Sequence, residues 1–189
     1  MEFLKKGVAY FKEKKIWAKQ AQLLEKIVEL KPNPNINEYF DLMYAYYNED
    51  KNSRSRDIAI TMRDKFNDQV FGYEWAFRNA AIIDTVKRDS IAVPDAVKLY
   101  DFTQQDTTKF KYQYILAVRY LAGYYINTAK DREKALEFFR KWMAADTRNA
   151  ETIQGYIDAI EKAPAPKPGT KPANPTKSTG KTQAPAAGN

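Results

Sequence analysis

The sequence contains no cysteine and no histidine. Their absence excludes structural zinc sites built from these residues, thiol redox chemistry, and every catalytic mechanism that needs an imidazole base. The groups left for catalysis are carboxylates, lysines and hydroxyls, and no spacing among them fixes two carboxylates across a cleft. We therefore expect no enzymatic activity, no metal site and no cofactor. The lack of cysteine also leaves the redox compartment undetermined, because such a chain tolerates either environment.

Long apolar segments are missing as well. No run approaches the roughly 18 apolar residues of a membrane span, and the N-terminus lacks the apolar core of a signal peptide. The helical pattern begins directly after Met1. This start favours a fragment of a longer chain, whose targeting signal would then lie upstream.

Residues 163–189 differ from the rest of the chain because they contain no aromatic residue and no isoleucine, leucine or valine. Such a segment cannot bury enough apolar area to offset the entropy lost on ordering, so we predict a disordered tail. The tail holds four lysines and no acidic residue, and thus four of the seven net positive charges. The remaining 162 residues have a mixed surface, unlike the concentrated basic surface of a dedicated nucleic-acid binder. Nucleic acid is therefore not the expected partner.

Apolar residues elsewhere recur at the spacing of amphipathic helices, and short polar breaks separate them. The predicted helices are 3–14, 16–31, 36–48, 54–67, 71–86, 94–105, 109–128, 131–145 and 149–162. Asn35 followed by Glu38 predicts a capping box, and Pro94 suits the first turn of a helix. Asn149 is expected to cap the last helix.

The alternating helices resemble the tetratricopeptide repeat, whose first helix has the pattern W-x2-L-G-x2-Y. The residues at this spacing are Phe3, Gly7 and Tyr10, then Tyr39, Met43 and Tyr46, and more loosely Trp75, Asn79 and Ile82, then Arg119, Gly123 and Ile126. Ala135 and Phe139 carry the A-x3-F step of a second helix. Gly7, Met43, Asn79 and Gly123 are 36, 36 and 44 residues apart, against a family period of about 34. We expect an insertion in 86–93 to account for the longest step.

The resemblance implies an all-α, right-handed superhelical stack of antiparallel helix pairs over residues 1–162. Its expected units are residues 1–34, 35–69, 70–107 and 108–148, followed by a capping helix at 149–162. In that last helix Ile153, Tyr156, Ile157 and Ile160 form one apolar stripe, as a terminal cap requires. The chain looks like a divergent bacterial member, and similar proteins often work in the cell envelope. We expect a soluble protein, with the periplasm favoured over the cytoplasm if the parent chain has an upstream signal.

In proteins of this family, the first helix of each pair lines a concave groove that receives a peptide or helix. Carried over by position, the expected partner-binding residues are Phe40, Tyr44, Tyr47, Tyr73, Phe77, Tyr120, Tyr124 and Asn127. Tyrosine suits recognition because it brings a large contact area at a low cost in rotamer entropy. The alternative is that these aromatic residues form the core between neighbouring helix pairs. The expected partner is a protein or peptide, whose identity the sequence does not specify, and neither does it specify the oligomeric state.

Two other functions stay open. The chain can be the solubilising C-terminal end of a longer helical solenoid whose working surface lies upstream, and exposed Phe3 and Phe11 would then mark the cut interface. Alternatively, the lysine-bearing tail can attach the protein to an anionic polymer, in which case binding must weaken steeply with salt.

Overall fold

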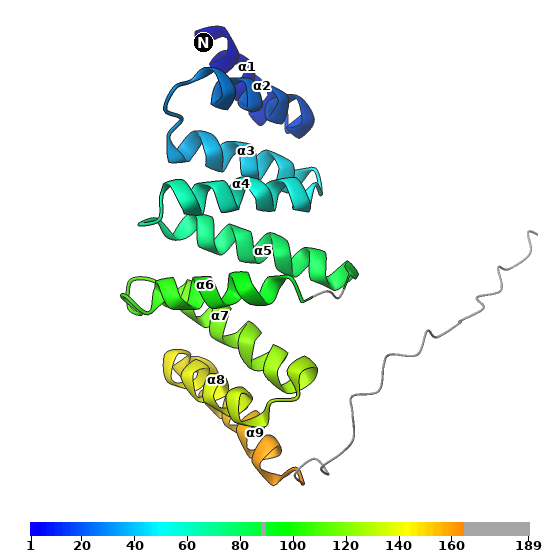
Figure 1. The fold of residues 1–189 in the computed structure, drawn as a ribbon, viewed down its shortest axis with the longest axis vertical. Coiled ribbons are helices and arrows are strands. Elements are labelled where there is room, and N and C mark those ends of the chain that lie inside the picture. The colour runs from blue at the N-terminus through cyan, green and yellow to red at the C-terminus, as the bar shows by residue number, and fades with distance from the viewer. Residues whose placement is uncertain (88–89, 165–189) are drawn as a thin grey trace, which may run out of the picture.

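The computed structural model describes residues 1–87 and 90–164, and every regular element within these residues is a helix (Figure 1). The α-helices are α1 (Glu2–Glu13), α2 (Trp17–Leu30), α3 (Ile36–Asn48), α4 (Asn52–Lys65), α5 (Val70–Lys87), α6 (Ala92–Thr103), α7 (Lys111–Tyr124), α8 (Arg132–Ala145) and α9 (Ala150–Lys162). A π-helical turn, Tyr125–Ala129, extends α7, and a 3-10 turn, Thr147–Asn149, precedes α9. The predicted all-α fold is confirmed. The predicted disordered tail lies, from residue 165 on, outside the described residues.

One residue with a left-handed backbone lies in the turn inside each helix pair. The four are Lys15, Asp50, Ser90 and Lys130, with φ values of 53°, 56°, 56° and 57°. In the first, second and fourth turns, the next amide donates to the carbonyl five residues earlier. These bonds run from Ile16 N to Phe11 O (2.9 Å), from Lys51 N to Tyr46 O (3.0 Å) and from Asp131 N to Tyr125 O (2.9 Å). This is the Schellman arrangement, which satisfies the last carbonyls of a helix and reverses the chain. The same turn therefore closes successive helix pairs.

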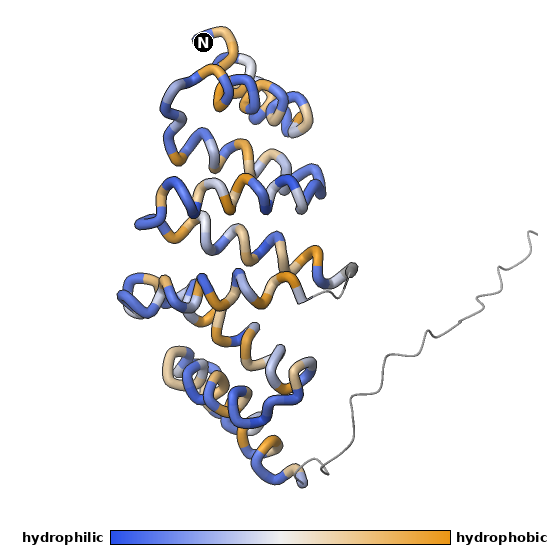
Figure 2. Tube along the Cα trace, viewed as in Figure 1, coloured by the Kyte–Doolittle hydropathy of each residue, from blue (hydrophilic) through white to orange (hydrophobic). Residues whose placement is uncertain are grey.

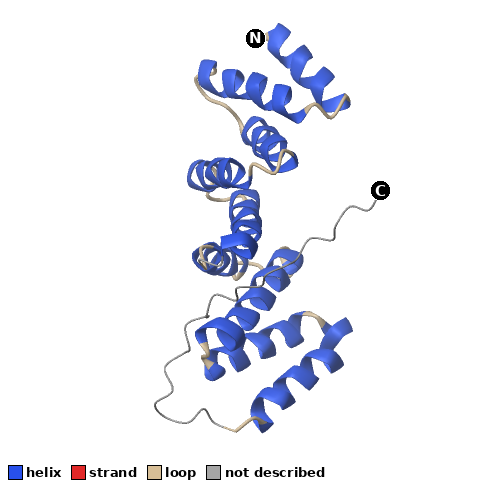
Figure 3. Ribbon diagram, turned by 90° about the vertical axis from the view of Figure 1, so that its right-hand side faces the viewer, coloured by secondary structure: helices blue, strands red, loops and turns tan. Residues whose placement is uncertain are grey.

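The helix pairs stack one after another along the long axis of the molecule (Figure 1). Extensive contacts among the described residues join helices that are consecutive in the chain, as expected of a solenoid and not of a closed bundle. The stack is curved, and both of its ends lie toward the side occupied by α3 and α5, whereas α4 and α6 lie on the other side (Figure 3). We call the side with α3 and α5 the inner side.

Each helix alternates apolar and polar residues (Figure 2), and the apolar residues form three clusters of buried side chains along the stack. One cluster joins α1, α2 and α3, the next joins α3, α4 and α5, and the largest joins α5 to α9. Because each cluster shares a helix with the next, the core is continuous from one end to the other.

Two polar or steric features fix the middle of the stack. Asp95 of α6 is buried and accepts hydrogen bonds from Arg56 Nε (2.8 Å) and Arg63 Nη1 (3.2 Å) of α4, so that side chains link two second helices of neighbouring pairs. Gly72 of α5 lies so close to α4 that a Cβ atom there would be 2.3 Å from the backbone nitrogen of Arg63. Glycine is therefore needed for the close approach of α4 and α5.

The predicted caps have mixed outcomes. The capping box of Asn35 and Glu38 is present at the start of α3, and Pro94 lies in the first turn of α6. The prediction for Asn149 is wrong, because its side chain makes no cap bond to α9 and instead donates to Asp146 Oδ2 at 2.8 Å. The expected insertion in 86–93 is not a long loop, because α5 continues to Lys87 and α6 begins at Ala92.

Candidate functional site: an aromatic face on α3 and α5

Helix α3 presents Phe40, Tyr44 and Tyr47 on one face, each partly exposed. They follow one another at i, i+4 and i+7, the spacing that aligns side chains along one side of a helix. Tyr39 and Tyr46, which lie on the opposite side, are buried in the core. The exposed rings are therefore a second apolar face of α3, separate from the face that packs between helix pairs.

Helix α5 continues this face with Phe71 and Trp75. Phe71 is 44% exposed and its ring centroid lies 5.9 Å from that of Phe40. The centroid of Trp75 lies 6.1 Å from Phe40, 5.9 Å from Tyr44 and 5.0 Å from Tyr47, always in an edge-to-face arrangement. We call these five residues the inner aromatic face.

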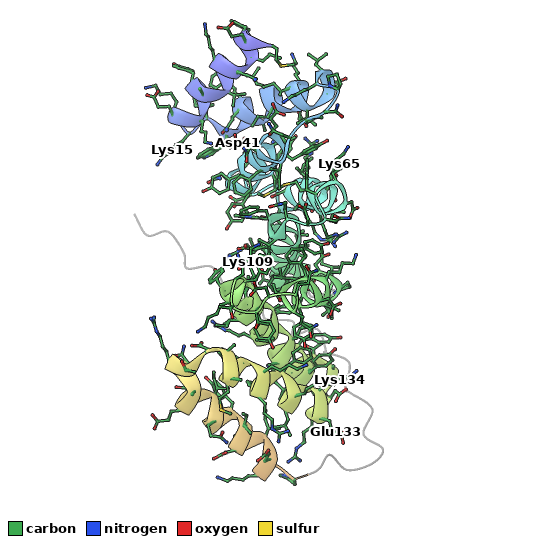
Figure 4. The ribbon with its side chains drawn as sticks, turned by 90° about the vertical axis from the view of Figure 1, so that its left-hand side faces the viewer. Lys15, Asp41, Lys65, Lys109, Glu133 and Lys134 are labelled. Carbon is green, nitrogen blue, oxygen red and sulfur yellow. The ribbon has the colours of Figure 1, made fainter. Side chains whose placement is uncertain are left out.

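The side of the stack that carries this face can be followed in Figure 4. Asp41 of α3 and Lys109, just before α7, lie on the inner side, and Lys65 at the end of α4 lies on the opposite side. The helical spacing places Asp41 beside Phe40 and Tyr44 on the exposed half of α3. Lys12 of α1 donates to Asp41 Oδ1 at 2.7 Å, so an ion pair borders the aromatic residues at their N-terminal end.

Neighbouring contacts hold the rings in place. Phe40 stacks on Tyr44, and Tyr44 stacks on Tyr47, each pair with centroids 6.1 Å apart. Trp17, at the start of α2, meets Tyr44 edge to face at 6.2 Å. Because aromatic pairs in such geometries stabilise by about 0.5–1.5 kcal/mol each beyond their area burial, the face is arranged before any ligand arrives.

Arg78 extends the face towards α7. Its guanidinium lies 5.6 Å from the ring centroids of both Trp75 and Tyr112, and it donates to Glu74 Oε1 (2.8 Å) and to the Tyr112 hydroxyl (2.6 Å). Gln113 donates to the other oxygen of Glu74 at 3.0 Å. Burial acts to lower the pKa of Arg78, but the hydrogen bond to Glu74 outweighs it and the pKa is raised above the ordinary value. A permanently charged group thus links the third helix pair to the fourth.

Several hydrogen-bond donors of the face are unused. Among the described residues, no hydrogen bond involves the hydroxyls of Tyr44 and Tyr47 or the indole N–H of Trp75, whereas the indole N–H of Trp142 donates to Asp146. An aromatic ring that offers both apolar area and a directed donor is typical of recognition surfaces. The face therefore has apolar area and polar groups available to a ligand.

The structure separates the residues that sequence analysis assigned to this surface. Phe40, Tyr44 and Tyr47 lie together on it. Phe77 is 3% exposed and packs in the core against Tyr120 at 4.9 Å, so its expected position on an open surface is corrected.

The remaining assigned residues lie elsewhere. Tyr73 packs against Phe102 at 4.6 Å and donates to the carbonyl of Asn67. Tyr120 is half-buried beside Asp84, with its hydroxyl 3.5 Å from a carboxylate oxygen. Tyr124 contacts Tyr125, and Asn127 is exposed in the π-helical turn. These three tyrosines and Asn127 do not join the inner aromatic face.

Sequence analysis missed Phe71, Trp75 and Arg78 as surface residues. The signal that could have found them is their spacing of i, i+4 and i+7, which repeats the spacing of Phe40, Tyr44 and Tyr47.

The described residues offer little else as a site. They contain no group of three or more metal-ligating side chains. In the same part of the chain, no helix combines the length and the apolar character needed to cross a bilayer. A second aromatic cluster, formed by Phe139, Trp142 and Tyr156, joins α8 to α9 and stacks its rings on one another. This cluster lies at the far end of the stack and is the natural control for the inner aromatic face.

Comparison with known proteins gives one informative match. No protein-family model matches the chain, and no curated protein sequence matches it significantly. The fold is similar to a crystal structure of the C-terminal part of a TPR repeat-containing protein from Cytophaga hutchinsonii, with a TM-score of 0.67 and 25% sequence identity. The match covers 78% of this chain and 57% of that structure, so this chain spans little more than half of its relative's length.

Proposed function

Since the chain has a tetratricopeptide-repeat-like fold, we propose that it is a non-catalytic scaffold that holds a peptide segment of another protein against the inner aromatic face. Folds of this kind serve protein interaction through the curved surface that stacked repeats create. The resemblance supports the class of function, and the geometry of the face supports its place.

The observation that carries the proposal is the exposure of five contacting rings on α3 and α5. Aromatic rings in contact with water are costly, and a contiguous exposed apolar patch with polar groups on it marks an interaction site. The rings are already ordered by their mutual contacts, so a ligand that covers them loses little entropy in the protein. The face thus combines two properties of binding hot spots, which are large aromatic anchors and preorganisation.

A peptide fits this surface better than the other ligand classes. Charges of both signs surround the rings, with Lys12 paired to Asp41 and Arg78 paired to Glu74. Nucleic-acid binding would need basic residues that track a phosphate backbone. The tyrosine hydroxyls and the Trp75 indole N–H suit the carbonyl groups of a peptide main chain.

The proposal is tested by selection from a displayed library of random 12-residue peptides on the full chain. Selected peptides should cross-link to the photoreactive residue in the variant Tyr44→p-benzoylphenylalanine. The matched variant Tyr156→p-benzoylphenylalanine, on α9, should give no cross-link. Peptides that cross-link equally at both positions, or no enrichment after selection, would refute the proposal.

A second role is favoured by α1, where Phe3 is 85% and Tyr10 is 55% exposed. These residues lie on one side of the helix, at i and i+7, and a preceding helix pair of a longer solenoid would cover them. In that case Phe3→Glu with Tyr10→Glu would abolish association with a separately produced upstream helix pair of the parent chain. Unchanged association would remove this second role.

A further inference from the structure

The sequence that follows α9 is rich in proline. Six of the nine prolines in the chain lie there, at positions 164, 166, 168, 172, 175 and 185. Proline fixes φ near −65° and favours the polyproline II conformation, which has three residues per turn and no internal hydrogen bonds. In that conformation, main-chain carbonyls stay available to external donors.

The inner aromatic face has the features that recognise this conformation. Proline-rich segments bind to grooves lined by aromatic rings, because the rings pack against the proline rings and the preformed helix loses little entropy on binding. Trp75 and Tyr47 meet edge to face at 5.0 Å, and Phe40 and Phe71 do so at 5.9 Å, which forms a corrugated apolar surface. The unused donors of Tyr44, Tyr47 and Trp75 are directed groups of the kind that bind main-chain carbonyls.

The chain after α9 is long enough to reach this face. Four helix spacings of about 8–10 Å separate α9 from α5, which gives roughly 32–40 Å. A polyproline II segment extends about 3.1 Å per residue, so about 11–13 residues cover that distance. Residues 165–189 number 25, and the prolines at 175 and 185 are therefore within reach of Trp75.

We propose that the inner aromatic face binds proline-rich sequence, and that residues 165–189 of the same chain occupy it when no partner is bound. The inference rests on the proposed function, because it uses the same face. A short flexible tether supplies an effective concentration in the millimolar range, so an intrinsic Kd of about 1 mM already leaves half of the faces occupied. A partner must then displace the segment, which sets a threshold for binding and favours partners with a similar proline-rich sequence.

Electrostatic attraction does not explain this contact. The segment contains four lysines and no acid, whereas the rest of the chain has a small net positive charge. The contact depends on rings and prolines, so it should persist in 0.5 M NaCl, where the Debye length is below 8 Å.

The indole N–H signals of the three tryptophans in a ¹⁵N-labelled full-length chain test the inference. Replacing the five prolines between 166 and 185 by alanine should shift the signals of Trp75 and of its neighbour Trp17, independently of protein concentration. The signal of Trp142 should stay in place, because its N–H is bonded to Asp146 at the far end of the stack. The matched variant replaces Lys167, Lys171, Lys177 and Lys181 by glutamine and should leave all three signals unchanged. A synthetic peptide of residues 165–189, added to the proline variant, should restore the wild-type position of Trp75.

Two outcomes overturn the inference. Unmoved Trp75 in the proline variant shows that the segment does not occupy the face, and a shift in the lysine variant with none in the proline variant shows a contact driven by charge. The proposed function is judged separately, because peptides selected from the random library must still shift Trp75 if the face binds partners at all. A Trp75 signal that responds to those peptides and not to the proline variant refutes the inference alone.

Discussion

The indole ring of Trp75 on α5 meets the phenol ring of Tyr47 on α3 edge to face, with their centroids 5.0 Å apart. These residues belong to successive helix pairs, with all of α4 between them in the chain. Their contact joins the two pairs on the inner side of the curve, where each ring also contacts Tyr44. The surface that we assign to binding is thus built by the stacking of pairs and is not a property of a single helix.

The close approach of α4 and α5 predicts opposite effects for two glycine substitutions. Gly72→Ala places a Cβ atom against the backbone of Arg63 and should destabilise the fold by about 1–3 kcal/mol or more. Gly155→Ala, in the middle of α9 with nothing within 4 Å of the new Cβ, should stabilise it by about 0.5–1 kcal/mol. Urea unfolding of both variants measures the two changes. Equal effects of the two substitutions would show that α4 and α5 do not cross at Gly72.

The buried carboxylate of Asp95 predicts a large loss of stability when it is removed. Asp95→Ala leaves Arg56 and Arg63 without their shared partner, although the side chain of Arg63 is only 10% exposed. Breaking a buried pair in this way costs about 3–5 kcal/mol. Asp101→Ala on the exposed side of α6 is the control and should change the free energy of unfolding by less than about 0.5 kcal/mol. A small effect at Asp95 would mean that the ion pairs are not formed in solution.

The left-handed turn residue Lys130 predicts a stabilising substitution. A non-glycine residue in this conformation costs about 1–2 kcal/mol relative to an ordinary helical backbone, and glycine avoids that cost. Lys130→Gly should therefore raise the free energy of unfolding by up to about 1 kcal/mol after the greater freedom of glycine in the unfolded chain is included. Lys134→Gly inside α8 is the matched control and should lower it by about 1 kcal/mol. A loss of stability at both positions would contradict the turn geometry.

Tyr120 predicts a loss of stability at high pH. Burial, together with the adjacent charge of Asp84, raises the pKa of Tyr120 from 10.0 to about 12. The folded chain then holds the phenol proton more tightly than the unfolded chain does. The contribution of this group is complete below pH 10 and is lost as the pH rises from 10 through about 12. Thermal unfolding of the wild type should weaken more steeply over this range than that of Tyr120→Phe, and parallel curves would refute the assignment.

The helices themselves could be predicted from the sequence because their signals are local. Apolar periodicity and polar breaks place the helix ends within two residues of the observed ones, apart from the π-helical turn after Tyr124. The turns inside the pairs could not be predicted in the same way. Their left-handed positions are occupied by two lysines, an aspartate and a serine, where glycine would have been the recognisable signal.

Only the α3 part of the inner aromatic face could be predicted, and the reason is a shift in repeat register. The sequence pattern aligns Met43 with Asn79, a step of 36 residues, whereas the contact between Phe40 and Phe71 corresponds to a step of 31. At 3.6 residues per turn, a difference of five residues rotates a helix by about 140°. This rotation exchanges the exposed and buried faces of α5, which explains why Phe77 was expected on the surface and Trp75 was not.

The affinity of one library-selected peptide for three proteins tests the central claim most directly. Isothermal titration with the wild type, with Tyr44→Ala combined with Trp75→Ala, and with Tyr156→Ala compares the inner aromatic face with an aromatic residue of similar exposure on α9. Removing two aromatic anchors of about 2 kcal/mol each should weaken binding by roughly 100-fold or more, with helicity by circular dichroism unchanged. Tyr156→Ala should bind like the wild type. Undiminished binding by the double variant would contradict the account.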